Sequence, residues 1–142
     1  MTPTPTSEAP ASRGMPLDGT DVLVIEDVPD SLALMAQVLR MAGATVHEAV
    51  DATDALAQLD AGLRPDIIVS DIGMPGMDGY ELIEAIRALP LDPQPPAVAL
   101  TAYARRDDRL RALRAGFQAH LSKPADTEEI VATLASLVAL VR

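Results

Sequence analysis

The stretch VLVIED (residues 22–27) is a short run of apolar, mostly β-branched residues that ends in two carboxylates. Three later stretches repeat this pattern: IIVSD (67–71), AVALT (97–101) and FQAHLSK (117–123). Continuous apolar runs of this length are typical of parallel strands that are buried on both faces. The stretch ATVHE (44–48) is more polar, and it predicts an edge strand.

Helical patterns lie between these runs, because apolar residues recur there at positions i, i+3, i+4 and i+7. The four stripes are Leu32, Met35, Ala36 and Leu39; Ala52, Ala55, Leu56 and Leu59; Leu82, Ile83, Ile86 and Leu89; and Ile130, Leu134, Leu137, Val138 and Val141. A weaker helix is expected over residues 105–115, which carry five arginines. The alternation predicts an α/β fold of five βα units, a flavodoxin-like doubly wound parallel sheet in the order 2-1-3-4-5 with five helices.

Local signals agree with the expected helix ends. Asp78 and Asp126 each begin a sequence that resembles a capping box, and Pro29 fits the first turn of a helix. Gly43 and Gly116 follow expected helices, at the position where a left-handed residue commonly ends one.

The composition limits both the domain count and the class of protein. A length of 142 residues predicts one domain, and residues 1–19, rich in Pro, Thr, Ser and Gly, are expected to form a disordered tail or linker before a domain over residues 20–142. The absence of Cys excludes disulfides, Cys-zinc sites and thiol catalysis. With 21 acidic against 11 basic residues, the formal charge of −10 argues against direct binding of nucleic acid.

No stretch of the sequence predicts export or membrane insertion. The N-terminal residues lack the apolar segment of a signal peptide. The longest apolar stretch, residues 132–141, is about half the ~20 residues that span a bilayer. We therefore expect a cytoplasmic location without a membrane partner.

Chemistry is expected where the strands end, because ligands of such folds bind at the carboxyl ends of the strands. The residues that follow or end the strands are Glu26, Asp27, Asp71, Thr101 and Lys123. Three carboxylates and one ammonium carry a net charge of −2, which favours a divalent cation, and Mg²⁺ suits a site that offers only oxygen ligands. Asp71 ends the central strand and is the candidate nucleophile toward phosphorus.

These residues resemble the receiver domain of two-component response regulators over about residues 20–142. The matching motifs are VLVIED (22–27), PDIIVSDIGMPGMDG (65–79), ALTA (99–102) and GFQAHLSKP (116–124). The resemblance implies that Asp71 accepts a phosphoryl group from a phosphohistidine. It also implies that Lys123 pairs with that group, that Thr101 donates a hydrogen bond to it, and that the peptide bond between Lys123 and Pro124 is cis.

The resemblance further implies a magnesium site and a conformational switch. Glu26, Asp27, Asp71 and the backbone carbonyl of Gly73 would hold Mg²⁺. The switch residues would be Thr101 and His120, although the family often has Tyr or Phe at the position of His120. Gly73 and Tyr103 occupy positions that tune the lifetime of the phosphoryl group in the family.

We expect a signalling domain rather than an enzyme, although it would assist its own phosphorylation and dephosphorylation. Its partners would be a histidine kinase or histidine phosphotransfer domain and a downstream protein, and it could act alone or belong to a hybrid sensor kinase. The alternative is a pseudo-receiver, an interaction module of the same fold that works without phosphorylation. An aspartyl phosphatase is disfavoured because Gly73 stands where such enzymes carry a second Asp, and a flavodoxin-like carrier is disfavoured by the scarcity of aromatic residues.

Overall fold

A computed structural model describes residues 14–102 and 106–141 of the chain. Strands and helices alternate as the sequence predicts: β1 (Asp21–Ile25), α2 (Pro29–Met41), β2 (Thr45–Ala49), α3 (Ala52–Asp60), β3 (Ile67–Asp71), α4 (Gly79–Arg87), β4 (Ala97–Thr101), α5 (Arg106–Ala115), β5 (Ala119–Ser122) and α6 (Thr127–Val141). All strand pairs are parallel, and the sheet order β2-β1-β3-β4-β5 is the predicted one. The strand β2 lies at one edge of the sheet, as its polar residues indicate, and β5 lies at the other.

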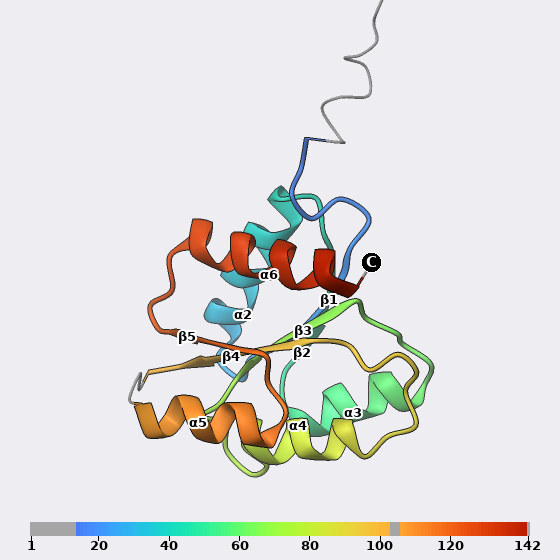
Figure 1. Cartoon of the computed structure of the whole chain (residues 1–142), viewed down its shortest axis with the longest axis vertical. Coiled ribbons are helices and arrows are strands. Elements are labelled where there is room, and N and C mark those ends of the chain that lie inside the picture. The colour runs from blue at the N-terminus through green and yellow to red at the C-terminus, as the bar shows by residue number, and fades with distance from the viewer. Residues whose placement is uncertain (1–13, 103–105, 142) are drawn as a thin grey trace, which may run out of the picture.

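The helices cover both faces of the sheet (Figure 1). Helices α2 and α6 lie on one face, and α3, α4 and α5 lie on the other. Each face encloses its own apolar layer, because both faces of β1, β3 and β4 carry buried side chains. The carboxyl ends of the strands therefore meet at one edge of a three-layer molecule, which is where this topology places ligands.

The predicted helix signals at Pro29, Gly43, Asp78 and Gly116 have the expected geometry. Asp78 and Glu81 form a complete capping box at the start of α4, and Pro29 begins α2. Gly43 and Gly116 follow α2 and α5 with φ angles of 100° and 130°, in the left-handed region that glycine tolerates. Among the described residues, no helix is long and apolar enough to cross a membrane.

One prediction about burial was wrong, and one residue of the expected tail packs in the core. Val141 was placed in the apolar stripe of α6, but its side chain is exposed at the last residue of the helix. Leu17 was placed in the tail, yet it is fully buried among the apolar side chains between the sheet and the α2–α6 layer. The folded domain therefore begins before residue 20.

Candidate functional site

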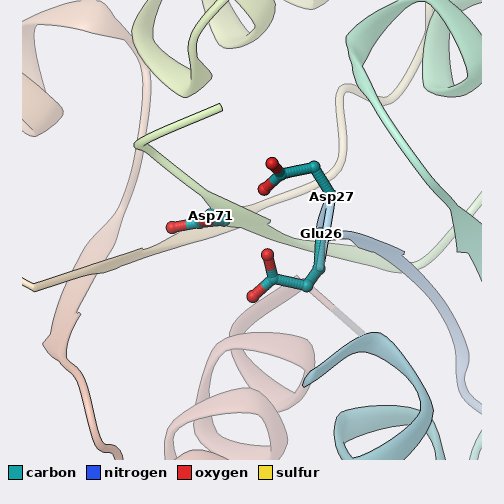
Figure 2. A group of neighbouring side chains, drawn as sticks. All are labelled: Glu26, Asp27 and Asp71. Carbon is teal, nitrogen blue, oxygen red and sulfur yellow. The ribbon is translucent and has the colours of Figure 1, made fainter. Parts of the chain in front are cut away.

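The register of β1 and β3 brings three carboxylates together. Ile25 of β1 pairs with Ser70 of β3, so the residues that follow Ile25 lie beside Asp71. Oxygens of Glu26, Asp27 and Asp71 all lie within 4.8 Å of one another. Figure 2 shows the three side chains facing a common space at the ends of the two strands. Three like charges this close repel one another unless a cation compensates them.

Lys123 supplies part of that compensation from the end of β5. Its ammonium Nζ lies 3.0 Å from Glu26 Oε1 and 3.0 Å from Asp71 Oδ1. The backbone N–H of Lys123 donates to the carbonyl of Thr101 at 2.7 Å, which anchors the lysine to β4, and the peptide bond to Pro124 is cis. Burial alone would lower the pKa of Lys123, but the hydrogen bonds and charges of Glu26 and Asp71 outweigh burial and raise that pKa. The lysine therefore stays charged.

One carboxylate oxygen of the group is buried without a hydrogen-bond partner among the described residues. Glu26 is buried, and its Oε2 accepts a hydrogen bond of 3.2 Å from the N–H of Val28. Asp27 Oδ1 is buried as well, yet it has no hydrogen-bond partner among the described residues. A buried carboxylate oxygen without a donor is costly, and a hard cation satisfies it. The donor set, three carboxylates around one orphaned oxygen, therefore fits Mg²⁺.

A pocket of about 660 Å³ opens next to these carboxylates. Asp27, Asp71, Gly73, Thr101 and Lys123 all line it, so the structure brings most of the predicted site residues to one cavity. Glu26 lines a neighbouring apolar pocket instead, and Lys123 lines both pockets. Gly73 leaves open space, since a Cβ atom there would meet nothing within 4 Å.

His120 lies on β5 opposite Ala99 and does not line this pocket. Its Nε2 is buried without a hydrogen-bond partner among the described residues. Burial lowers the pKa of His120, the charge of Arg109 lowers it further, and Asp108 opposes both. The lowered pKa favours the neutral imidazole near pH 7, so an uncharged but polar ring occupies the predicted switch position. Tyr103 lies outside the described residues.

The lining residues that sequence reasoning did not assign to the site include Tyr80, Asp108 and Arg111. Tyr80 lies in the first turn of α4, and the other two lie on α5. The guanidinium of Arg111 lies over the Tyr80 ring, 4.1 Å from its centroid. The sequence holds a weak signal for this arrangement, because the arginines of α5 are too many for a helix that only covers a sheet.

The chain is similar to known signalling proteins over most of its length. The model of the response regulator receiver domain matches residues 22–135. An uncharacterized 14.6 kDa protein of Leptolyngbya boryana is 48% identical over 111 residues, which are 78% of this chain and 84% of that protein. The transcriptional regulatory protein PrrA of Mycobacterium tuberculosis is 40% identical over 117 residues, 82% of this chain but only 49% of PrrA. The chain thus spans about half the length of that regulator.

Solved structures agree with the sequence relatives. A putative response regulator from Chloroflexus aurantiacus superimposes with a TM-score of 0.79 at 31% identity, covering 84% of this chain and 98% of that one. The chemotaxis response regulator CheY4 of Vibrio cholerae gives a TM-score of 0.77 at 29% identity, covering 83% and 98%. With the matching family model and the site geometry, these similarities show that the chain belongs to the response regulator receiver domains of two-component signalling.

Proposed function

We propose that this receiver accepts a phosphoryl group on Asp71 from the phosphohistidine of a histidine kinase or histidine phosphotransfer domain. The observation that carries the proposal is the pairing of Lys123 with Asp71 and Glu26, at 3.0 Å each, beside the unpartnered oxygen of Asp27. Charges packed this closely reduce the stability of a fold. Such clusters are typical of functional sites, and a pseudo-receiver has no need to keep three carboxylates and a lysine in this arrangement.

The chemistry follows from the positions of these groups. An oxygen of the Asp71 carboxylate attacks phosphorus, a new O–P bond forms, and the P–N bond to the donor imidazole breaks with its electron pair passing to the ring nitrogen. The reaction needs no base on this chain, since a carboxylate is already deprotonated at neutral pH. Lys123 neutralises a phosphoryl oxygen, and the Thr101 hydroxyl donates a hydrogen bond to another.

A magnesium ion would be held by Glu26, Asp27, Asp71 and the backbone carbonyl of Gly73. When bound, Mg²⁺ offsets negative charge on the phosphoryl oxygens. The residues that hold the ion also fix the acceptor, because Asp71 belongs to both sets. The same site would release its own phosphoryl group when water reaches the acyl phosphate, so the domain would assist its own dephosphorylation.

The output is a change in a protein-binding surface. Phosphorylation adds about 1.5 to 2 negative charges beside the buried Thr101. Thr101 ends β4 and pairs with Ser122 of β5, so a shift of Thr101 toward the phosphoryl group reaches His120 two residues earlier on β5. We infer that the downstream partner binds near β5 and its neighbouring helices, and that the exchange takes place in the cytoplasm.

The test measures whether Asp71 accepts a phosphoryl group. The protein is incubated with Mg²⁺ and acetyl phosphate, and its intact mass is recorded; we expect a gain of about 80 Da, the mass of one HPO₃ group. Asp71→Asn should abolish the adduct, whereas Asp60→Asn, at the exposed end of α3, should keep it. Failure of the wild-type protein to gain this mass, and to bind beryllofluoride, would favour the pseudo-receiver.

A further inference from the structure

The pocket beside Asp71 has a second cation on its wall. Arg111 belongs to α5 and is exposed, but its guanidinium lies over the ring of Tyr80 and lines the same pocket as Asp71 and Lys123. A guanidinium over an aromatic face is held by a cation–π attraction, and the planar group keeps its N–H donors free at the edge. The ring thus orients a cation in the wall of the pocket, and its guanidinium donates no hydrogen bond to a described side chain.

Within the described residues Arg111 forms no ion pair, although carboxylates line both pockets that it borders. Lys123, in contrast, already pairs with two carboxylates. Of the two described cations that line the pocket, Arg111 is therefore the one without an ion-pair partner, and its charge is available to an incoming anion.

An incoming phosphodonor needs such a cation. Asp27, Asp71, Asp78 and Asp108 line the pocket and give it a negative field that repels a phosphoryl dianion. The guanidinium fork of arginine matches the oxygens of a phosphoryl group in a two-point contact. The absence of a side chain at Gly73 leaves room for the donor beside Asp71.

We propose that Arg111 binds the phosphoryl group of the incoming donor and thereby sets the affinity of the Asp71 site for phosphodonors. This inference rests on the proposed phosphoacceptor function. Arg111 would contact the donor before transfer, while Asp71 remains the nucleophile and the bonds that form and break are unchanged. Acyl phosphates and phosphoramidates carry the same phosphoryl group. The affinity of the site for both classes of donor should therefore depend on Arg111 to the same degree.

A purely structural role makes a different prediction. If the stack of Arg111 on Tyr80 only joins α5 to α4, its loss would lower the stability of the domain without changing the donor concentration that half-saturates phosphorylation. The two roles therefore separate in a kinetic experiment that resolves half-saturation from the rate at saturating donor.

The experiment uses Arg111→Gln, with Arg114→Gln as the matched control. Arg114 lies one turn later on α5, is equally exposed, and lines the neighbouring cleft between α4 and α5 but not the Asp71 pocket. Initial phosphorylation rates with Mg²⁺ are measured by intact mass against the concentration of acetyl phosphate and, separately, of phosphoramidate. The P–N bond of phosphoramidate resembles that of phosphohistidine. Inorganic phosphate binding, followed by backbone amide NMR shifts, gives a readout independent of transfer.

With Arg111→Gln we expect the half-saturating concentration of both donors to rise about fivefold, with the rate at saturation within about twofold of wild type. Inorganic phosphate should bind more weakly by a similar factor, and Arg114→Gln should match wild type in every measurement. Equal half-saturation in Arg111→Gln and wild type would overturn the inference and leave the proposed function intact. An equal rise of the half-saturating concentration in Arg114→Gln would also overturn the inference. It would indicate that the overall positive charge of α5, and not a contact of Arg111, attracts the donor. If wild type gains no adduct at all, the proposed function fails and this inference fails with it.

Discussion

At the scale of single residues, the site is a group of charges that the fold does not fully compensate. Lys123 pairs with Glu26 and Asp71, and no described residue donates a hydrogen bond to Asp27 Oδ1. In the absence of a cation, the three carboxylates repel one another, and this repulsion opposes folding. A cluster of carboxylates that binds a ligand is expected to lower the stability of the ligand-free domain.

Asp27→Asn tests whether the carboxylate cluster lowers stability without Mg²⁺ and binds Mg²⁺. Replacing one of three carboxylates with a neutral isostere should raise the free energy of unfolding without Mg²⁺ by on the order of 1 kcal/mol, because it removes repulsion across distances of up to 4.8 Å. Wild-type protein should gain about 2.7 kcal/mol when Mg²⁺ reaches 100 times its Kd. The variant should lose most of that gain. Urea unfolding with and without Mg²⁺ measures both effects.

Asp30→Asn is the control for this prediction. Asp30 is exposed in the first turn of α2, where a carboxylate is favourable to the helix dipole, so its loss should lower stability slightly and leave the response to Mg²⁺ unchanged. An Asp27→Asn protein that is less stable than wild type without Mg²⁺, or that keeps the full Mg²⁺ response, would contradict the prediction.

At the scale of helices and strands, the sequence predicted most of what was needed to place the site. The apolar runs that became β1, β3 and β4 are continuous because both faces of those strands are buried, and this pattern fixed the parallel sheet. The polar residues after each run then had to meet at one edge. Arg111 and Tyr80 could not be found in this way, because periodicity tells which side of a helix faces the sheet but not which side chains meet between neighbouring helices.

The start of α4 shows how closely an element can approach the acceptor. A Cβ atom on Gly79 would lie 2.5 Å from the backbone oxygen of Asp71 and 2.8 Å from Cα of Ile72. The N–H of Gly79 also donates to the carbonyl of Ile72 at 2.9 Å, so the first turn of α4 is held against the end of β3. The absence of a side chain at Gly79 thus lets α4 support the position of Asp71.

Gly79→Ala and Gly73→Ala should therefore differ sharply. Gly79→Ala should lower the free energy of unfolding by about 1 to 3 kcal/mol, because backbone atoms on both sides must move to admit the methyl group. Gly73→Ala places its methyl group in open space at an ordinary φ, so its stability should stay within about 0.5 kcal/mol of wild type. Urea unfolding of the two variants checks this pair, and equal losses in both would show that the packing of α4 does not matter.

At the scale of the whole molecule, the segment around Leu17 contributes to the core at the N-terminal end of the domain. The composition of residues 1–19 indicated a tail, because Pro, Thr, Ser and Gly rarely build a core. The segment around Leu17 is an exception, because this apolar residue packs into the core. Leu17 is fully buried on the α2–α6 side of the sheet, and its N–H donates to the carbonyl of Ala42 at 2.9 Å. The turn also passes close to Gly43, where a Cβ atom would lie 2.9 Å from Cβ of Met15.

A chain of residues 14–142 should consequently be more stable than a chain of residues 20–142. Leu17→Ala alone, in the longer chain, should lower the free energy of unfolding by about 2 to 5 kcal/mol, since it leaves a cavity under the α2–α6 layer. The shorter chain should lose at least as much, because it also loses the hydrogen bond to Ala42. Met15→Ala, at an exposed position of the same turn, should cost far less. Equal unfolding curves for the two chains would place the boundary at residue 20 after all, and would mean that the α2–α6 layer closes without Leu17.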